Sequence, residues 1–238
     1  MHDNESLILV PGLVCDATVW HAQVASLAGP WHIQVAAHGA ASSLGEMAEG
    51  VLAIAPARFA LAGHSMGGRV ALEIMARAPQ RVARLALLDT GFEALPAGEA
   101  GERERAGRYR LRDIARRDGM LAMGREWARG MVHPRRLGDD AFMEVIHRMI
   151  ARAPLALFEA QIQALLARPD RTGLLTQIQV PTLVLCGAED SWSPLARHAD
   201  MARRIPGSRL VVVPDCGHMS TLEQPAAVTA ALRTWLQA

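Results

Sequence analysis

The sequence predicts an α/β fold in which a mostly parallel sheet of about six strands is flanked by helices on both faces. Short aliphatic runs alternate with segments of helical periodicity along most of the chain. These runs are apolar at consecutive positions, which is typical of strands buried on both faces of a parallel sheet. The alternation is interrupted between residues 92 and 171, where the pattern is helical throughout. We therefore expect a helical insertion after the fourth strand.

Four strands are expected in the first part of the chain. Their aliphatic runs are Leu7–Val10, Ile33–Ala36, Phe59–Ala62 and Leu85–Leu88. Asp16 is a suitable helix cap, and we expect the helix that follows it to reach about Leu27. Ser43 and Glu46 have the spacing of a capping box, which predicts a second helix as far as Ile54.

The helix expected after the third strand is amphipathic. Its apolar positions recur with helical spacing, and they are Gly67, Val70, Ala71, Ile74 and Met75. The opposite face carries Arg69, Glu73 and Arg77, each four residues from the next. Opposite charges at that spacing attract one another on an exposed helix, so we expect a solvated ladder of ion pairs there.

The alternation of strands and helices resumes after the insertion. Strands are expected at Thr182–Leu185 and Leu210–Val213. Between them a helix is expected to open with Ser193 as its cap and Pro194 in its first helical position. A last amphipathic helix begins near Pro225 and continues to the end of the chain.

The interruption also predicts the domain organisation. Residues 1–91 and 172–238 are expected to form the core, and residues 92–171 a helical cap subdomain, because a structureless loop of that length would be unusual. The arginines of this segment are interleaved with Asp and Glu. We therefore expect them to form a solvated face rather than an anion receptor.

Composition narrows the class of protein. The 238 residues carry 25 basic and 24 acidic side chains, so no charge excess indicates a nucleic-acid partner. No apolar run approaches the roughly 20 residues that cross a bilayer, and no secretory signal is recognisable. The odd number of cysteines, which are Cys15, Cys186 and Cys216, suits a reducing compartment. We expect a cytoplasmic protein without a membrane partner, and its oligomeric state is left open.

The segment Gly63-His64-Ser65-Met66-Gly67-Gly68 carries the clearest chemical signal. It directly follows an expected strand and precedes an expected helix, which is the context that a G-x-S-x-G nucleophile elbow requires. Such a turn strains the backbone of the serine and needs neighbours almost free of side chains. It would lift the Ser65 hydroxyl above the sheet and place the Met66 amide at a helix N-terminus, where negative charge is stabilised.

With this motif the chain resembles the α/β-hydrolase family, and the resemblance covers almost its whole length. Each place that carries it follows an expected strand; they are Pro11-Gly12-Leu13-Val14, Gly63 to Gly68, Gly187-Ala188-Glu189-Asp190 and Cys216-Gly217-His218-Met219. In the family these places are the oxyanion loop, the elbow, the loop of the acid and the loop of the histidine. The resemblance implies an α/β-hydrolase fold with a cap over the active site.

A catalytic triad follows from the resemblance. Ser65 would be the nucleophile, His218 its general base, and Asp190 the acid that orients and stabilises the imidazole. Some members of the family place the acid after the fourth strand, where this chain has Asp89. We favour Asp190 because Gly-Ala-Glu-Asp fits the family motif.

An oxyanion hole follows as well. The backbone amides of Leu13 and Met66 would bind the oxyanion of a tetrahedral intermediate. Pro11 departs from the family, which usually has a histidine before this glycine, so we expect the loop to be supported differently. The chemistry implied needs no metal and no cofactor.

The substrate pocket is expected to lie between these loops and the cap. Its expected lining residues are Val14, His64, Trp127, Phe142, Trp192 and Met219. Methionine adapts to irregular spaces, and four more residues would either line the pocket or pack the cap helices together: Met120, Met123, Met131 and Met149. His64 is expected mainly to pack or to form a hydrogen bond. Three other histidines lack the spacing of a metal site and are expected at the surface: His133, His147 and His198.

Together these features predict a serine hydrolase that cleaves carboxylic esters of small to medium, largely apolar substrates through an acyl-enzyme. The fold alone does not decide the reaction. A C–C bond hydrolase, a lactonase or a lyase would use the same triad. A small-molecule receptor without catalysis is a further alternative, which the intact set of Ser, His and Asp disfavours.

Overall fold

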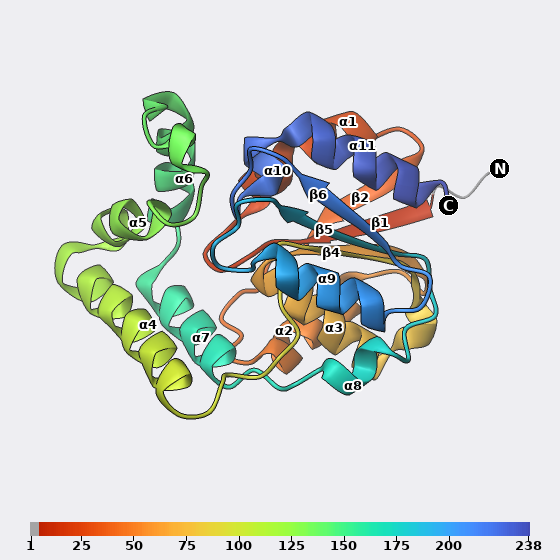
Figure 1. Ribbon diagram of the computed structural model, residues 1–238, viewed down its shortest axis with the longest axis horizontal. Helices are drawn as coiled ribbons and strands as arrows, with labels where there is room; N and C mark the ends of the chain where they lie inside the picture. The colour runs from red at the N-terminus through yellow and green to blue at the C-terminus, as the bar shows by residue number, and fades with distance from the viewer. Residues whose placement is uncertain (1–4) are drawn as a thin grey trace.

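A single sheet of six parallel strands organises the computed structural model, which describes residues 5–238 (Figure 1). Its order is β2-β1-β3-β4-β5-β6. The strands are β1 (Glu5–Val10), β2 (Trp31–Val35), β3 (Phe59–His64), β4 (Val82–Leu88), β5 (Thr182–Gly187) and β6 (Arg209–Val213). Every neighbouring pair is parallel. The predicted α/β class and strand number are therefore confirmed.

The strand order reverses between β1 and β3. The chain passes from β1 to β2 on one side and then places β3 on the other side of β1. In open α/β sheets, ligands bind outside the carboxyl ends of the strands at such a point. Gly12 follows β1 and Ser65 follows β3. Both loops therefore lie where the topology favours a ligand site.

Helices cover both faces of the sheet. On one face lie α1 (His21–Leu27), the short α10 (Ser220–Glu223) and α11 (Pro225–Leu236), and on the other lie α2 (Leu44–Ile54), α3 (Met66–Arg77) and α9 (Leu195–Arg204) (Figure 1). β3 and β5 are buried along their whole lengths between these layers. Full burial of one aliphatic side chain contributes about 1.5–3 kcal/mol, so the sheet is a stable support for the loops at its edge.

Two of the predicted caps are present and the third is displaced. Asp16 accepts a hydrogen bond from the Thr18 amide at 2.8 Å and begins the 3₁₀ turn η1 (Ala17–Trp20) before α1. Ser43 accepts from the Glu46 amide at 3.1 Å at the start of α2. Ser193 does not cap α9, where Pro194 occupies the cap position. The Ser193 amide instead donates to the Asp190 carboxylate at 2.9 Å, which keeps it in the preceding loop.

The predicted solvated ladder on α3 is only partly present: Arg77 Nε lies 3.9 Å from a Glu73 oxygen, but Glu73 is not solvated. Glu73 is only 2% exposed, and both of its carboxylate oxygens accept hydrogen bonds from Arg171, at 2.7 and 2.6 Å. Arg69 donates to the backbone carbonyl of Glu93 at 2.8 Å rather than to Glu73. The chain returns from the insertion at Arg171 and covers this face of α3. Helical periodicity alone cannot reveal such a contact.

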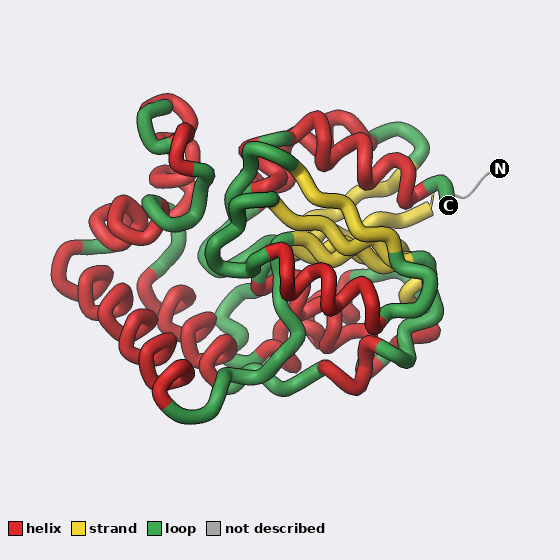
Figure 2. The backbone as a smooth tube through the Cα atoms, viewed as in Figure 1, coloured by secondary structure: helices red, strands yellow, loops and turns green. Residues whose placement is uncertain are grey.

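The insertion consists of helices that stand beyond the carboxyl ends of the strands, apart from the sheet (Figures 1 and 2). They are α4 (Glu99–Asp118), α5 (Met120–Ala128), the 3₁₀ turn η3 (Pro134–Arg136), α6 (Asp140–Ala151) and α7 (Leu155–Leu166), followed by the short α8 (Thr172–Leu175). α4 packs on α5 and α7, and α5 packs on α6. The role of the insertion as a cap remains a prediction.

Residues 5–238 contain no helix with the length and apolar character needed to cross a membrane. The cytoplasmic location expected from the sequence stays a prediction.

Candidate active site

Ser65 occupies a strained turn between β3 and α3. Its backbone has φ 55° and ψ −118°, in the left-handed half of conformational space that residues with a side chain rarely adopt. A Cβ added to Gly63 would collide with the backbone of Gly67, and one added to Gly67 would collide with the backbone of Val10. The turn therefore requires glycine on either side of the serine, as the motif predicts.

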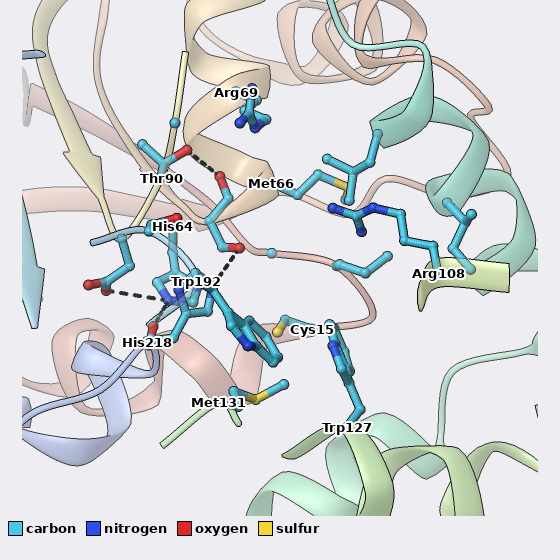
Figure 3. A pocket seen from close by; sticks show the side chains of 18 of the residues that line it. Cys15, His64, Met66, Arg69, Thr90, Arg108, Trp127, Met131, Trp192 and His218 are labelled. Carbon is cyan, nitrogen blue, oxygen red and sulfur yellow. Dashed lines mark hydrogen bonds and ion pairs between the residues drawn. The ribbon is translucent and has the colours of Figure 1, made fainter. Parts of the chain in front are cut away.

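The turn brings Ser65 to His218, and His218 to Asp190. The Ser65 hydroxyl lies 2.8 Å from His218 Nε2 (Figure 3). His218 Nδ1 lies 2.8 Å from Asp190 Oδ2. The other carboxylate oxygen of Asp190 accepts from the amides of Trp192 and Ser193, both at 2.9 Å. This arrangement holds the imidazole with one nitrogen toward the hydroxyl and the other toward a fixed carboxylate.

Electrostatics bias both ionisable groups toward their charged forms. Burial disfavours the imidazolium, but the charge and hydrogen bond of Asp190 raise the pKa of His218 above its ordinary value. Burial also disfavours the carboxylate of Asp190, but the charge and hydrogen bond of His218 and the two amide hydrogen bonds lower its pKa. The pair is therefore suited to hold the positive charge that forms when the imidazole accepts a proton.

The loop after β1 lies against the serine. A Cβ added to Gly12 would stand 3.1 Å from the Ser65 Cβ. Among the residues that the structure describes, no acceptor receives a hydrogen bond from the backbone amide of Leu13 or of Met66. Unpaired amides next to a nucleophile can bind an oxyanion.

Two side chains support this loop in place of the usual family histidine. The Pro11 carbonyl accepts a hydrogen bond from His38 Nε2 at 2.9 Å. The Val14 amide donates to the Gln161 Oε1 at 2.8 Å. Sequence reasoning missed both residues, and no local signal could have found them, because they lie 27 and 147 positions away from their partners.

Asp89 is close to the site but takes no part in the Ser65–His218–Asp190 chain of hydrogen bonds. It is buried, and its carboxylate accepts from the Gly187 amide at 3.0 Å and from the Ser220 hydroxyl. Burial, followed by the negative charge of Asp190, raises the pKa of Asp89. In this geometry Asp190 contacts the His218 ring and Asp89 does not, and the role of Asp190 as the acid stays a prediction.

His64 supports the site and takes no part in the hydrogen bonds that join Ser65, His218 and Asp190. Its Nε2 donates to the backbone carbonyl of His218 at 2.8 Å. Burial, followed by the charge of His218, lowers the pKa of His64 to about 3, so it is neutral near pH 7. This contact braces the histidine loop, in line with the expected packing and hydrogen-bonding role.

A cavity of about 460 Å³ opens at the serine, a size typical of small-molecule sites. One part of its wall is apolar and aromatic. Trp127 stacks on Trp192 with ring centres 5.2 Å apart, and Trp192 lies 5.0 Å from the His218 ring (Figure 3). The other apolar residues of this wall are Leu13, Met66, Met131, Phe158, Ile162, Leu165 and Met219.

Four of the six expected pocket residues line this cavity, namely His64, Trp127, Trp192 and Met219. The prediction is wrong for the other two. Val14 is buried in the oxyanion loop, where Gln161 holds its amide. Phe142 on α6 does not line the cavity; it lies under the Arg136 guanidinium, whose Cζ is 4.8 Å from the ring centre. Its position in an apolar stripe did not reveal which neighbour the stripe faces.

The expectations for the four methionines and the three remaining histidines are met only in part. Of the four methionines, Met131 lines the cavity, while Met123 and Met149 are buried among helices and Met120 packs partly buried against them. His198 is not at the surface; it is fully buried, and its Nε2 accepts from the Thr90 amide at 3.0 Å. His133 and His147 are partly exposed.

The expectation of a wholly solvated arginine face is also wrong. The cavity wall includes Arg69, Arg108, Arg110, Arg168 and Arg197. Three of these, Arg108, Arg110 and Arg168, come from the inserted segment, and the Arg168 side chain is only 5% exposed.

Comparisons with known proteins agree with this geometry. A model of the alpha/beta hydrolase family matches residues 7–232. A pimeloyl-[acyl-carrier protein] methyl ester esterase of Aeromonas hydrophila is 30% identical over 240 residues, which cover 92% of this chain and 90% of that protein. A 2-succinyl-6-hydroxy-2,4-cyclohexadiene-1-carboxylate synthase of Serratia proteamaculans is 28% identical over 182 residues, covering 75% of this chain and 68% of that protein.

Solved structures show the same similarity. A thermophilic esterase from Thermogutta terrifontis superposes with a TM-score of 0.86 and 31% identity, covering 98% of this chain and 89% of that one. The chain spans only 61% and 63% of the length of two further curated relatives that it matches.

Proposed function

This chain belongs to the α/β-hydrolase family, and from that premise we propose that it cleaves carboxylic esters through an acyl-enzyme on Ser65. The observation that carries the proposal is the continuous hydrogen bonding from the Ser65 hydroxyl through His218 to Asp190. A serine hydroxyl becomes a strong nucleophile when an adjacent base takes its proton, and here the base is held in place by a carboxylate.

The reaction then follows from the positions of the groups. Ser65 Oγ attacks the ester carbonyl while His218 Nε2 accepts its proton, and Asp190 stabilises the imidazolium. The amides of Leu13 and Met66 bind the oxyanion of the tetrahedral intermediate, where each donor contributes about 3 kcal/mol. His218 next gives the proton to the departing alcohol, which leaves the acyl group on Ser65. Water repeats the sequence, releases the acid and restores the serine.

We also propose that residues 92–171 act as the cap and set substrate size. This segment contributes Trp127, Met131, Phe158, Ile162 and Leu165 to the cavity wall, so its side chains would contact the acyl or alcohol part of the substrate. No group of the proposed triad comes from it. The size of the cavity supports small to medium substrates.

A second reaction class has specific support. The similarity to a 2-succinyl-6-hydroxy-2,4-cyclohexadiene-1-carboxylate synthase favours a lyase or C–C bond hydrolase that uses the same groups. Similarity to ester hydrolases extends over more of the chain, which is why we propose ester cleavage first.

The test is a panel of methyl and aryl esters of increasing chain length, with the Ser65→Ala protein as blank. Turnover by the wild type alone supports ester hydrolysis. A fluorophosphonate probe, read by mass spectrometry, reports separately whether Ser65 is activated. Labelling of Ser65 without turnover of any ester would favour the lyase or C–C hydrolase, and a folded protein with neither would point to a receptor.

A further inference from the structure

One wall of the active-site cavity carries an unusual concentration of positive charge. We call Arg69, Arg108, Arg168 and Arg197 the arginine cluster; all four line the cavity that opens at Ser65. They come from four separate places in the fold: α3, α4, the loop just after α7, and α9. Figure 3 shows Arg69 and Arg108 on the side of Met66 and Thr90, whereas Trp127 and Met131 lie on the other side of the view.

Two members of the cluster share one carboxylate. Arg168 donates to both oxygens of Glu104, at 2.7 and 2.8 Å, and its side chain is only 5% exposed. Arg108 donates to Glu104 Oε1 from Nε and Nη2, at 2.9 and 2.7 Å. Burial opposes ionisation of Glu104, but these hydrogen bonds and charges lower its pKa to about 2. Glu104 is therefore a carboxylate shared by two guanidinium groups.

Of the other two members, only Arg197 forms an ion pair with a carboxylate. Arg197 Nε lies 3.3 Å from a carboxylate oxygen of Glu93. Arg69 donates only to the backbone carbonyl of Glu93, at 2.8 Å, and forms no ion pair with any residue between 5 and 238. Burial, followed by the charges of Arg168 and Arg197, lowers the pKa of Arg69 to about 9. Arg69 thus lies on the cavity wall as a half-buried cation without a carboxylate.

The balance of charge around the cluster is therefore positive. Four guanidinium groups meet the two carboxylates of Glu93 and Glu104. An unpaired charge held out of water is costly, and the cost falls when an anion arrives. Gly91 keeps room for this arrangement, since a Cβ there would stand 2.6 Å from Arg69 Nη2 and 3.1 Å from Arg197 Cδ.

We propose that the arginine cluster is an anion-binding subsite, and that the substrate is an ester that also carries a carboxylate, bound by the guanidinium of Arg69. A guanidinium matches a carboxylate in shape and donates two parallel hydrogen bonds to it. The proposal rests on the proposed ester hydrolysis at Ser65 and specifies its substrate class. The aromatic wall would contact the carbon chain while the cluster holds its charged end.

The experiment compares esters that differ only in a terminal carboxylate. Monomethyl esters of dicarboxylic acids, from succinate to suberate, are matched with methyl esters of the neutral fatty acids of equal length. A second arm places the carboxylate in the alcohol, as in butyrate esters of hydroxy acids against butyrate esters of simple alcohols. The proteins are the wild type, Arg69→Gln, and Arg103→Gln as control. Arg103 lies on the inserted segment, away from the cluster; its side chain is 72% exposed and pairs only with Glu99.

We expect the wild type to prefer the carboxylate member in at least one arm. Arg69→Gln should lower kcat/KM for that ester by about 30-fold, mainly through KM, because a charged bidentate hydrogen bond is lost. Its activity on the matched neutral ester should stay within about twofold, and Arg103→Gln should change neither value. Equal use of charged and neutral esters by the wild type in both arms would overturn the proposal. So would an equal loss on both esters in Arg69→Gln, because that result indicates a purely structural role.

A binding measurement separates this proposal from the proposed hydrolysis. Calorimetry on the Ser65→Ala protein should detect the carboxylate ester of the preferred arm, for example monomethyl adipate. Its neutral match, for example methyl hexanoate, should bind at least tenfold more weakly, and the double variant Ser65→Ala/Arg69→Gln should lose that difference. If the wild type turns over no ester but the carboxylate ester binds in this manner, the hydrolysis fails and the subsite stands. If esters are cleaved but the charged and neutral esters bind equally, the subsite fails and the hydrolysis stands.

Discussion

Gln161 of α7 and Val14 of the loop after β1 are joined by a buried hydrogen bond of 2.8 Å. Gln161 is only 1% exposed, and its Oε1 accepts the hydrogen bond from the Val14 amide. Val14 has φ 48°, a strained value for a β-branched residue, so the loop needs such support. The neighbouring amide of Leu13 is the proposed oxyanion donor. The inserted helices and the catalytic loop are therefore mechanically linked.

Loss of this link should slow the reaction. Gln161→Met keeps the size of the side chain but leaves the Val14 amide without its acceptor, which costs about 1–3 kcal/mol of stability. We expect kcat on a neutral ester to fall at least tenfold with little change in KM, because the oxyanion donor is misplaced. Gln161→Glu, which keeps an acceptor, should recover part of kcat. Gln163→Met is the matched control on the exposed side of α7; equal losses in the two Met variants would refute the link.

The two buried carboxyl groups should differ sharply in importance. Asp190→Asn should lower kcat by about 10⁴, because the amide cannot hold the imidazole in the required tautomer or stabilise its charge. Asp89→Asn should lower kcat far less, since burial already raises the pKa of Asp89 and an asparagine can still accept from the Gly187 amide. Steady-state kinetics on one ester, with circular dichroism as a check of folding, would decide the ranking. A larger loss in Asp89→Asn would move the acid to the end of β4.

Activity should rise with pH. The Ser65 proton can be accepted only by neutral His218, and Asp190 raises the pKa of His218. We therefore expect kcat/KM to increase through an apparent pKa above the ordinary value of about 6.5. A pH–rate profile measures this value directly. An apparent pKa well below about 6.5 would show that the imidazolium of His218 is not stabilised as the geometry indicates.

The stability that the His218–Asp190 pair contributes should decrease as the pH rises above neutrality. The raised pKa of His218 contributes stability that is complete below its unfolded value and is lost as the pH rises through its folded value. The lowered pKa of Asp190 contributes stability above its unfolded value and loses it as the pH falls. Wild type should thus exceed Asp190→Asn in unfolding free energy by more at about pH 5.5 than at about pH 9. Denaturant unfolding at both pH values tests this, and a constant difference would contradict it.

Substrate size should depend on Trp127 and not on Phe142. Trp127 lines the cavity and stacks on Trp192, whereas Phe142 packs under Arg136 away from it. Trp127→Ala should shift the chain-length preference toward longer or bulkier esters and leave fluorophosphonate labelling of Ser65 intact. Phe142→Ala serves as the matched aromatic control and should keep the wild-type preference. Loss of labelling in a folded Trp127→Ala protein would mean that the cap acts directly in catalysis.

Much of the fold could be predicted from local patterns. The six strands follow from short aliphatic runs that alternate with helical segments, a pattern typical of a parallel sheet covered on both faces. β3 and β5 are buried throughout, whereas the edge strands β2 and β6 are partly exposed. The elbow follows from Gly63 and Gly67, since a serine in that turn leaves no room for larger neighbours. Asp190 and His218 follow from the resemblance to the α/β-hydrolase family, and the parallel sheet brings the two residues together because the carboxyl ends of its strands lie at one edge.

Only the tertiary structure decided which helix faces were covered and by what. Glu73 is buried by Arg171, His198 by the loop of Thr90, and Phe142 is turned away from the cavity, although each has an ordinary local pattern. The arginine cluster and the Gln161–Val14 bond likewise join segments far apart in the chain. Helical periodicity states which residues share a face, but the neighbour of that face, whether water, a carboxylate or a substrate, is set by how the inserted helices pack on the sheet.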